Sequence, residues 1–162
     1  DIISQSLGVQ PVLINSALVS AQNRKRLYWA NWDFGQPSNK NIKLFDILEK
    51  NPSIKPYCSG MPFTKIPTGD MIGYFGKNCQ SSRVYSTQNK SVSLCANGGG
   101  GGAKTGLYLV DDIIRKLTPV ECERLQTLLD NYTAGASDNQ RYKMLGNGWT
   151  VDVVTHILKD IR

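Results

Sequence analysis

Five consecutive glycines at positions 98–102 constrain the fold of this chain more than any other feature. A run without side chains disfavours a helix, and ordering it costs conformational entropy. Segments of β-forming composition flank it: RVYST at 83–87 and SVSLCA at 91–96 precede it, and GLYLV at 106–110 follows it. We therefore expect a loop within a small, mostly antiparallel β lobe over residues 57–110. The glycines suit either a backbone that closely approaches something bulky or a flexible tether, and the strand-like flanks favour the first.

Positive charge is concentrated in the same part of the chain. The net charge of the whole sequence is +6, and residues 34–110 alone carry nine Lys and Arg against three acidic residues. Residues 1–33 have a net charge of +1, and residues 111–162 have a net charge of −1. A basic block confined to one segment is typical of a nucleic-acid contact surface. A solvated face that favours solubility is the alternative, and charge alone does not separate the two.

The composition excludes several other classes of protein. No apolar run reaches the roughly 18–20 residues that a membrane-spanning helix needs, and the start of the chain does not have the pattern of a secretion signal. The four cysteines at 58, 79, 95 and 122 form no CxxC pair, and His156 is the only histidine. A zinc site is therefore not expected. We expect reduced cysteines, no metal and a cytoplasmic protein.

Other elements are expected on both sides of the β lobe. Residues 9–16 and 26–32 suit strands joined by a polar loop, and residues 42–50 suit one or two helical turns. A helix is predicted within residues 115–129, with Thr118 as N-cap, Pro at the first position and Glu three residues after the cap. A last helix is predicted over 150–162, where apolar residues recur at helical spacing.

Three of these segments together resemble DNA cytosine-5 methyltransferases. SAQNRKRLYWAN at 20–31 resembles their Q-x-R-x-R segment, with Gln22, Arg24 and Arg26 in the motif positions. RKLTPVECERLQTLLDNYT at 115–133 resembles the ninth motif of that family, and RYKMLGNGWTVDVVTHIL at 141–158 resembles the tenth. The three occur in the family's order, with a variable region of fitting size between the first two.

The middle of the chain is similar to the target recognition domain of HhaI-type bacterial enzymes, in an arginine before a Y-S-T strand and a glycine-rich loop that ends in A-K-T-G. The resemblance implies that Arg83 reads a guanine, because an arginine fork matches O6 and N7 of guanine in the major groove. The alternative for Arg83 is a surface salt bridge. Gln80 is expected in the first recognition loop, where it fills the space left by an extruded base. The full set of expected DNA-binding residues is Gln80, Arg83, Tyr85, Ser86, Gly98, Gly99, Gly100, Gly101, Gly102, Lys104 and Thr105.

The resemblance also implies a chemistry of which this sequence holds only part. In that family a cysteine thiolate adds to C6 of a flipped cytosine, a glutamate acts at N3 and an arginine contacts O2. Arg26 is the best match for the arginine, with Arg24 as structural or phosphate partner and Gln22 in the same catalytic segment. Ordinary surface arginines are the alternative. Asn78-Cys79-Gln80 lacks the proline of the nucleophile loop and follows the Q-x-R-x-R segment, so Cys79 is interpreted as a loop cysteine.

The tenth motif implies contact with S-adenosyl-L-methionine. Asn147, Gly148 and Trp149 are the expected cofactor-binding residues, and they supply only part of a site. Gly148 stands where the family often has Ser or Ala, so a hydroxyl contact is not expected there. Trp149 suits either the cofactor pocket or simple burial against the last helix.

The resemblance implies an α+β fold. It consists of the last strands of a Rossmann-like methyltransferase sheet, a small, mostly antiparallel β target recognition domain and a C-terminal helix. We expect the end of a catalytic domain at 1–34, the target recognition domain at 35–140, including the 115–129 helix, and a returning segment at 141–162. The strands near 9–32 are expected in a parallel-type sheet whose other strands lie elsewhere.

The resulting hypothesis is the C-terminal portion of a bacterial or phage enzyme that methylates cytosine in double-stranded DNA, as a fragment or a split subunit that is inactive alone. Its expected partners are DNA and an N-terminal catalytic half, and the isolated chain is expected to self-associate. A non-catalytic, sequence-specific DNA-binding module is the alternative. A nucleotidase phosphate cradle does not fit, because no Gly-Lys-Ser/Thr follows the glycines at the start of a helix.

Overall fold

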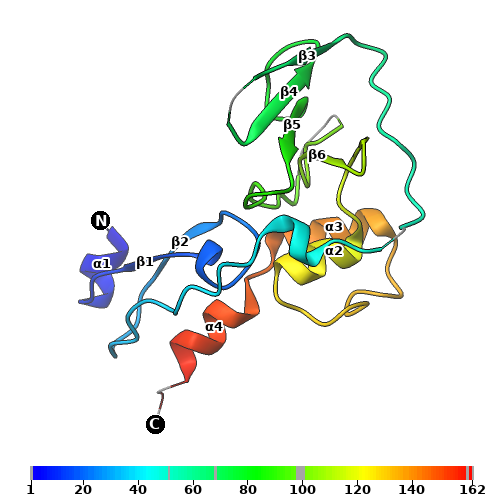
Figure 1. Ribbon diagram of the computed structural model, residues 1–162. Helices are drawn as coiled ribbons and strands as arrows, with labels where there is room; N and C mark the ends of the chain where they lie inside the picture. The colour runs from blue at the N-terminus through cyan, green and yellow to red at the C-terminus, as the bar shows by residue number, and fades with distance from the viewer. Residues whose placement is uncertain (1, 51, 68, 98–100, 160, 162) are drawn as a thin grey trace.

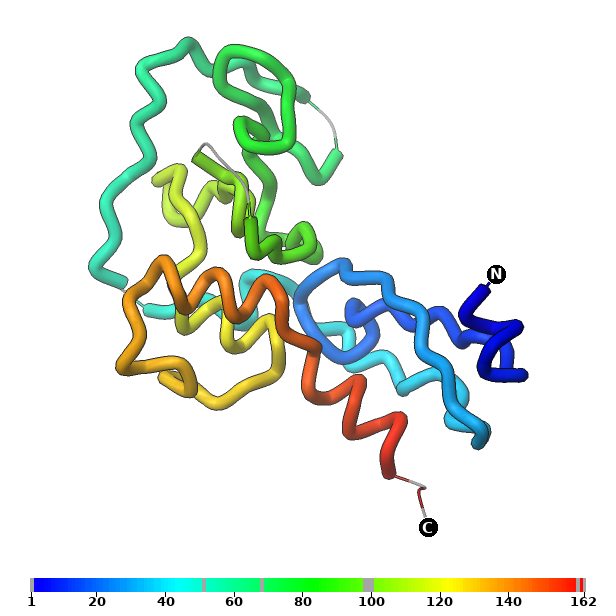
Figure 2. Tube along the Cα trace, turned by 180° about the vertical axis from the view of Figure 1, so that it is seen from behind, coloured from blue at the N-terminus to red at the C-terminus, as the bar shows by residue number. Residues whose placement is uncertain are grey.

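The computed structural model describes residues 2–50, 52–67, 69–97, 101–159 and 161. Its elements form two regions (Figure 1). A β lobe, defined here as residues 59–115, lies at the top of the view, and the helices and a small two-stranded sheet lie below it. An extended strap, residues 52–58, leads from the lower region up to the β lobe along one side, as the view from behind also shows (Figure 2).

The β lobe is built on one five-stranded sheet in chain order. Its strands are β3 (Phe63–Lys65), β4 (Met71–Phe75), β5 (Arg83–Ser86), β6 (Leu107–Val110) and β7 (Ile113–Arg115). All neighbouring pairs are antiparallel except β5 and β6, which are parallel. The prediction of a mostly antiparallel lobe is therefore confirmed. The parallel pair is possible because the connection that holds the glycine run is long enough for a crossover.

Two local features fix the sheet. The β6–β7 hairpin turns through Asp111 and Asp112, whose φ angles of 47° and 62° are those that a two-residue hairpin requires. The predicted strand at 91–96 does not form. Ser91 instead makes a single bridge to Gln22, and its N–H donates to the carbonyl of Ala21 at 2.7 Å. The backbone of this segment therefore joins the β lobe to the lower region instead of extending the sheet.

The lower region starts with helix α1 (Ile2–Leu7) and strands β1 (Val12–Asn15) and β2 (Lys25–Tyr28). The two strands pair antiparallel, which corrects the expectation of a parallel arrangement for this pair. The connection between them is too short for the dozen or more residues of a parallel crossover. Within 42–50 only a short 3-10 helix, η2 (Leu44–Ile47), forms.

The other helices are α2 (Pro119–Leu125), α3 (Asp138–Asn147) and α4 (Val151–Leu158). Helix α2 begins as predicted: the Thr118 hydroxyl accepts from the N–H of Glu121, and the Glu121 carboxylate accepts from the N–H of Thr118. It ends earlier than predicted, before Thr127, whose φ is 54°. Helix α3 was not predicted, because its sequence, DNQRYKMLGN, is mostly polar.

Two apolar clusters lie in the core. The larger one joins the β lobe to α2 and α3, and its buried members are Ala21, Leu44, Leu94, Tyr108, Leu117, Cys122, Leu125 and Leu145. The smaller one holds α4 against β1, and its buried members are Ile14, Val19, Phe34, Val153 and Ile157. All four cysteines are free thiols. Among the described residues no helix is long and apolar enough to span a membrane.

Candidate functional site

Gln22 lies at the centre of a buried network of polar groups. Its side chain is fully buried, and its amide nitrogen donates to the carbonyl of Leu125 at 2.9 Å and to the side chain of Gln126 at 3.1 Å. Its amide oxygen accepts from the N–H of Leu94 at 3.2 Å. Gln22 thereby links the Q-x-R-x-R segment both to the end of α2 and to the segment that follows Ser91.

Arg24 extends this network to the tenth motif. One terminal nitrogen donates to the carbonyl of Leu94 at 2.9 Å, and the other donates to the carbonyls of Gly146 at 3.0 Å and Gly148 at 2.9 Å. The side chain is only 3% exposed, and its burial lowers the pKa of the guanidinium. We call residues 20–24, 119–126 and 141–150 together the polar joint.

Gln126 completes the polar joint. Its amide nitrogen donates to the carbonyl of Leu145 at 2.6 Å, and its amide oxygen accepts from the hydroxyl of Thr150 at 3.0 Å. Since buried polar groups are costly unless they are paired, these bonds hold the three segments in one arrangement. In this arrangement Gln22 and Arg24 are occupied by protein groups.

Arg26 is the member of the motif that faces solvent. It lies on β2, is exposed, and donates to the carbonyl of Lys25 at 2.7 Å. Of the three residues in the motif positions, it is the one whose guanidinium is accessible to a ligand from outside the chain.

Arg83, at the start of β5, is held by the turn that precedes it. Its Nε donates to the side-chain oxygen of Asn78 at 2.8 Å. Its two terminal nitrogens make no hydrogen bond to any residue that the structure describes. Gln80, on the same turn, is exposed. The turn therefore orients one arginine fork and leaves its ends free.

Cys79 lies on the same turn of the β lobe, directly before Gln80. Its sulfur lies 3.4 Å from the hydroxyl oxygens of both Ser81 and Ser82, and hydrogen bonds from these serines lower the pKa of the thiol to about 7. Its position is that of a loop cysteine of the β lobe.

The other expected DNA-binding residues divide into exposed and packed groups. Tyr85 packs against the buried Tyr108, with ring centroids 6.0 Å apart, and the Ser86 N–H donates to the carbonyl of Asp70 at 2.8 Å. Thr105 is buried, and its hydroxyl donates to the carbonyl of Gly106 at 2.8 Å. Lys104 is partly exposed and donates to the side chain of Asn139.

Only part of the glycine run can be placed, since Gly98, Gly99 and Gly100 lie outside the described residues. The Gly102 N–H donates to the carbonyl of Ser81 at 2.8 Å. The end of the glycine run is therefore bonded to the turn that holds Arg83. Sequence reasoning missed Asn78 and Ser81, because a turn composition shows neither which arginine it holds nor which backbone it meets.

The tenth-motif residues lie at the surface where α3 ends. Asn147 is exposed, Gly148 is half-buried and Trp149 is 67% exposed, so Trp149 is not buried against the last helix. A groove of about 440 Å³ lies beside them and is lined mainly by apolar side chains, among them Tyr132, Met144, Trp149, Val154 and Leu158.

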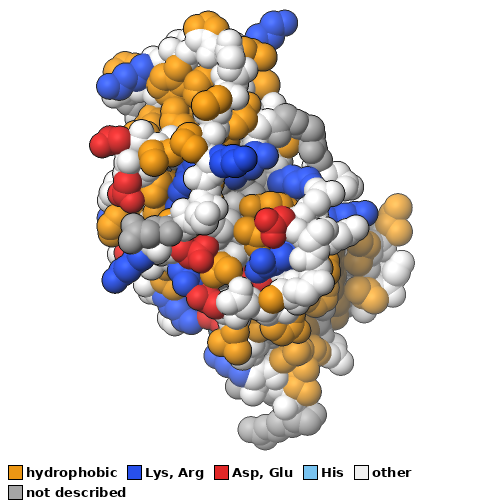
Figure 3. Space-filling model, turned by 90° about the vertical axis from the view of Figure 1, so that its right-hand side faces the viewer, with side chains coloured by type: hydrophobic (Ala, Val, Ile, Leu, Met, Phe, Trp, Pro, Cys, Tyr) orange, Lys and Arg blue, Asp and Glu red, His pale blue; other side chains and the backbone are white. Residues whose placement is uncertain are grey.

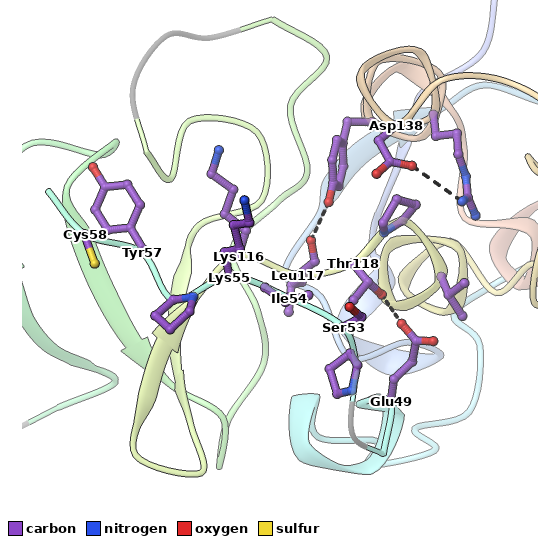
Figure 4. Close-up of a pocket in the computed structure, with 16 residues that line it drawn as sticks. Glu49, Ser53, Ile54, Lys55, Tyr57, Cys58, Lys116, Leu117, Thr118 and Asp138 are labelled. Atoms are coloured by element: carbon purple, nitrogen blue, oxygen red, sulfur yellow. Dashed lines mark hydrogen bonds and ion pairs between the residues drawn. The ribbon is translucent and has the colours of Figure 1, made fainter.

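A second groove, of about 640 Å³, separates the strap from the starts of α2 and α3 (Figure 4). Glu49 and Thr118 face each other at one end and are hydrogen-bonded, while Tyr57 and Cys58 lie at the other end, toward the β lobe. Behind Thr118, a buried ion pair joins Arg115 and Glu121 at 2.8 Å. Sequence reasoning assigned this groove no role. The hydrogen bonds of Glu49 and the ion pair of Arg115 connect the segment after η2, strand β7 and helix α2. In the part of the chain that the structure describes, no cluster of side chains is arranged to hold a metal ion.

Comparison with known proteins agrees with the sequence motifs. The model of the family of C-5 cytosine-specific DNA methylases matches residues 71–162. Type II methyltransferase M.HhaI of Haemophilus parahaemolyticus is 42% identical, over 86% of this chain and 48% of the relative. Type II methyltransferase M.Bsp6I of Bacillus sp. (strain RFL6) is 28% identical, over 86% of this chain and 50% of the relative.

Solved structures agree at the level of the fold. The crystal structure of the S. pombe Dnmt2 methyltransferase has a TM-score of 0.58 at 14% identity, over 93% of this chain and 54% of that one. An Entamoeba histolytica methyltransferase, EhMeth, has a TM-score of 0.57 at 12% identity, over 95% of this chain and 54% of that one. The chain thus spans about half the length of these two relatives, which it matches over most of its own length. With the family model matched over more than half of its residues, the chain belongs to the family of C-5 cytosine-specific DNA methylases.

Proposed function

We propose that this chain forms the target-reading and C-terminal part of an enzyme that transfers a methyl group from S-adenosyl-L-methionine to C5 of cytosine in a specific sequence of double-stranded DNA. The observation that carries the proposal is the polar joint. The single side chain of Arg24 bonds the Q-x-R-x-R segment both to the end of α3 and to the segment that enters the glycine run. The joint thus holds the surface arginine Arg26 and the tenth-motif residues in a fixed relation to the β lobe.

The β lobe is the proposed DNA reader. Most of it, up to residue 110, belongs to the basic segment of the chain, and phosphate contacts by Lys and Arg supply much of the affinity for DNA. Arg83 has two terminal nitrogens without a partner among the described residues, which suits bidentate contact with guanine. Gln80, on the same exposed turn, is the residue proposed to fill the space of an extruded base. Lys104, Ser86 and the backbone of the glycine run are proposed to contact the DNA around them.

For catalysis, Arg26 is proposed to contact the flipped cytosine, and Gln22 and Arg24 act as positioning residues behind it. Removing a base from the duplex costs a few kcal/mol, so the contacts that receive it must already be in place. The polar joint supplies that preorganisation. The nucleophilic cysteine and the glutamate of the family's chemistry belong to the proposed N-terminal half.

Asn147, Gly148 and Trp149 are proposed to form one wall of the cofactor site. All three retain accessible surface at the end of α3. An added Cβ at Gly148 would lie 3.2 Å from the carbonyl oxygen of Met144, so a side chain here would require that carbonyl to shift slightly, and the glycine itself offers only its backbone for contact. S-adenosyl-L-methionine, when bound, supplies the methyl group.

The surface of the lower region supports an N-terminal catalytic half as partner. Leu13 and Leu27 pair across β1 and β2 and are 52% and 47% exposed, which leaves one face of this small sheet uncovered. Hydrophobic side chains also gather over the lower part of the face shown in Figure 3, toward the C-terminal helix. Exposed apolar side chains that gather on one face are typical of a protein interface. In isolation the same surface is expected to make the chain self-associate. A cytoplasmic location in a bacterial or phage-infected cell is proposed with this role.

Reconstitution tests the proposal. The chain is combined with a polypeptide that covers the part of M.HhaI that it does not match, and transfer of labelled methyl from S-adenosyl-L-methionine to duplex DNA is measured. We expect no transfer by either part alone, transfer by the two together, and a large loss of transfer with Arg26→Ala. Transfer by the isolated chain would contradict the proposed division of labour. Sequence-selective DNA binding without transfer in any combination would favour a DNA-binding module instead.

A further inference from the structure

Tyr57, at the upper end of the strap, occupies the space that a side chain at position 101 would need. A Cβ added at Gly101 would lie 2.2 Å from both Cζ and the hydroxyl oxygen of Tyr57. The aromatic ring therefore lies directly against the backbone of Gly101.

Tyr57 is itself held from two sides. Its N–H donates to the carbonyl of Ile114 on β7 at 2.8 Å. Its ring meets the ring of Phe75 on β4 edge-on at 5.5 Å, and Phe75 in turn packs on Phe63 at 5.1 Å. A row of three aromatic rings therefore runs from the edge strand of the sheet to Gly101. Such pairs contribute stability beyond the area that they bury, so the ring is a firm support.

The backbone that rests on Tyr57 is connected to the turn that carries Arg83. The next residue, Gly102, donates its N–H to the carbonyl of Ser81 at 2.8 Å. The Ser82 N–H donates to the carbonyl of Cys79 at 3.0 Å, which closes the turn, and Asn78 holds Arg83. Tyr57, Ser81 and Gly101 also line one apolar cavity of about 370 Å³. Movement of the ring therefore changes the support of both loops.

We propose that Tyr57 is a positioning residue that sets the height of Gly101 and Gly102 against the Arg83 turn, and thereby determines how strongly the β lobe discriminates between DNA sequences. This inference rests on the proposed DNA-reading function. Tyr57 does not touch DNA in this proposal, and it acts through Gly101 and Gly102. A shift of one of the two loops misaligns the paired contacts to base edges, while contacts to phosphate tolerate it.

The test is a double-mutant cycle between Tyr57 and Gly101. The wild-type chain first selects duplexes from a library with a randomised core, and the ratio of its affinities for the selected duplex and for a scrambled duplex is then measured. We expect Tyr57→Ala and Gly101→Ala each to lower this ratio about tenfold, the scale of one base-edge contact. Tyr57→Phe, which keeps the ring, should stay within about twofold of the wild type. The double variant should lose less than the product of the two single losses, because the new methyl group occupies the space that the ring has left.

A second measurement reads the loop without DNA. Hydrogen exchange of the Gly102 amide, bonded to Ser81, should become faster in Tyr57→Ala, while the amides of Val84 and Leu107 inside the sheet should not change. Three results would overturn the proposal. The wild type selects a sequence but Tyr57→Ala leaves its affinity ratio unchanged; the losses of Tyr57→Ala and Gly101→Ala simply multiply in the double variant; or Gly102 exchange in Tyr57→Ala equals that of the wild type. A wild-type chain that selects no sequence contradicts the proposed DNA-reading function, and Gly102 exchange still decides whether Tyr57 positions the loop.

Discussion

The polar joint and the β lobe use the same kinds of side chain in opposite ways. In the joint, Gln22, Arg24 and Gln126 are buried, and their side chains bond to other parts of the chain. In the lobe, Gln80 is exposed, and one nitrogen of Arg83 is the one that a described residue holds. Buried and paired groups fix a geometry, because leaving one unpaired is costly. Groups held at one end and free at the other remain available to a ligand.

Glycine shows the same contrast. A Cβ added at Gly146 in the polar joint would lie 2.3 Å from backbone atoms of Cys95 and Ala96, which cannot move aside independently. The corresponding contact of Gly101 in the β lobe is with the end of a side chain. Close packing in the joint therefore depends on backbone against backbone, and in the lobe on a backbone resting against a ring.

The largest effect is expected from Arg24→Met. The change removes the arginine donor from the carbonyls of Leu94, Gly146 and Gly148, of which Gly148 keeps only the Gln126 amide at 3.3 Å among the described residues. We expect it to lower the free energy of unfolding by roughly 3–4 kcal/mol. Arg26→Ala, two residues away and exposed, is the matched control and should change it by less than about 0.5 kcal/mol. Urea unfolding measures both. Equal changes in the free energy of unfolding for Arg24→Met and Arg26→Ala would contradict the distinction between the buried Arg24 and the exposed Arg26.

Gly146→Ala should rank next. Its methyl group meets the backbone at 2.3 Å, and overpacking of this kind costs about 1–3 kcal/mol. The control is Gly148→Ala, whose nearest atom is the carbonyl oxygen of Met144 at 3.2 Å, and which should cost less than Gly146→Ala. Thermal unfolding of both variants tests this order, and a Gly148→Ala that is the less stable of the two would contradict the packing described.

A smaller effect is expected from Glu123 on α2. Burial raises the pKa of its carboxyl, but hydrogen bonds from Thr133, Arg141 and the Asn131 N–H outweigh it and hold the pKa below the ordinary value of 4.5. A lowered pKa in the folded chain stabilises it above the unfolded value, and this contribution is lost as pH falls through the folded pKa. The stability of Glu123→Gln should therefore depend less on pH below about 4.5 than that of the wild type.

Urea midpoints across that pH range measure this effect. Asp138→Asn is the control, because the Asp138 side chain is 73% exposed and its contact with Arg141 is long, at 3.8 Å. An unchanged pH profile in Glu123→Gln would show that the carboxylate does not anchor the 131–133 loop.

Sequence reasoning predicted the parts of this molecule that local patterns specify. The cap at Thr118, the strands at 83–86 and 107–110 and the last helix all form close to where they were expected. Helix α3 was missed because tertiary packing, through Leu145 and Gly146, buries one end of a polar sequence. The prediction of a strand at 91–96 was wrong because the backbone N–H and carbonyl of Ser91 bond to Ala21 and Asn23 instead of to a neighbouring strand of the sheet.

The candidate site was predictable by residue type and less so by environment. The motifs identified Gln22, Arg24 and Arg26 together, but spacing alone could not show that two of them are buried and the third is exposed. It also could not show that Asn78 holds Arg83 or that Tyr57 lies against Gly101, since both contacts depend on how turns meet in three dimensions. The roles of these residues toward DNA and cofactor, and the domain boundaries at 34 and 140, stay predictions.

The most direct test of the central claim, that the β lobe reads DNA sequence, is binding of the wild type and Arg83→Ala to a panel of short duplexes across a series of salt concentrations. We predict that the wild type prefers particular sequences. Arg83→Ala should reduce that preference by about 1–3 kcal/mol, while most of the salt dependence of binding remains. Binding that depends on salt but not on sequence, and that Arg83→Ala leaves unchanged, would contradict the claim.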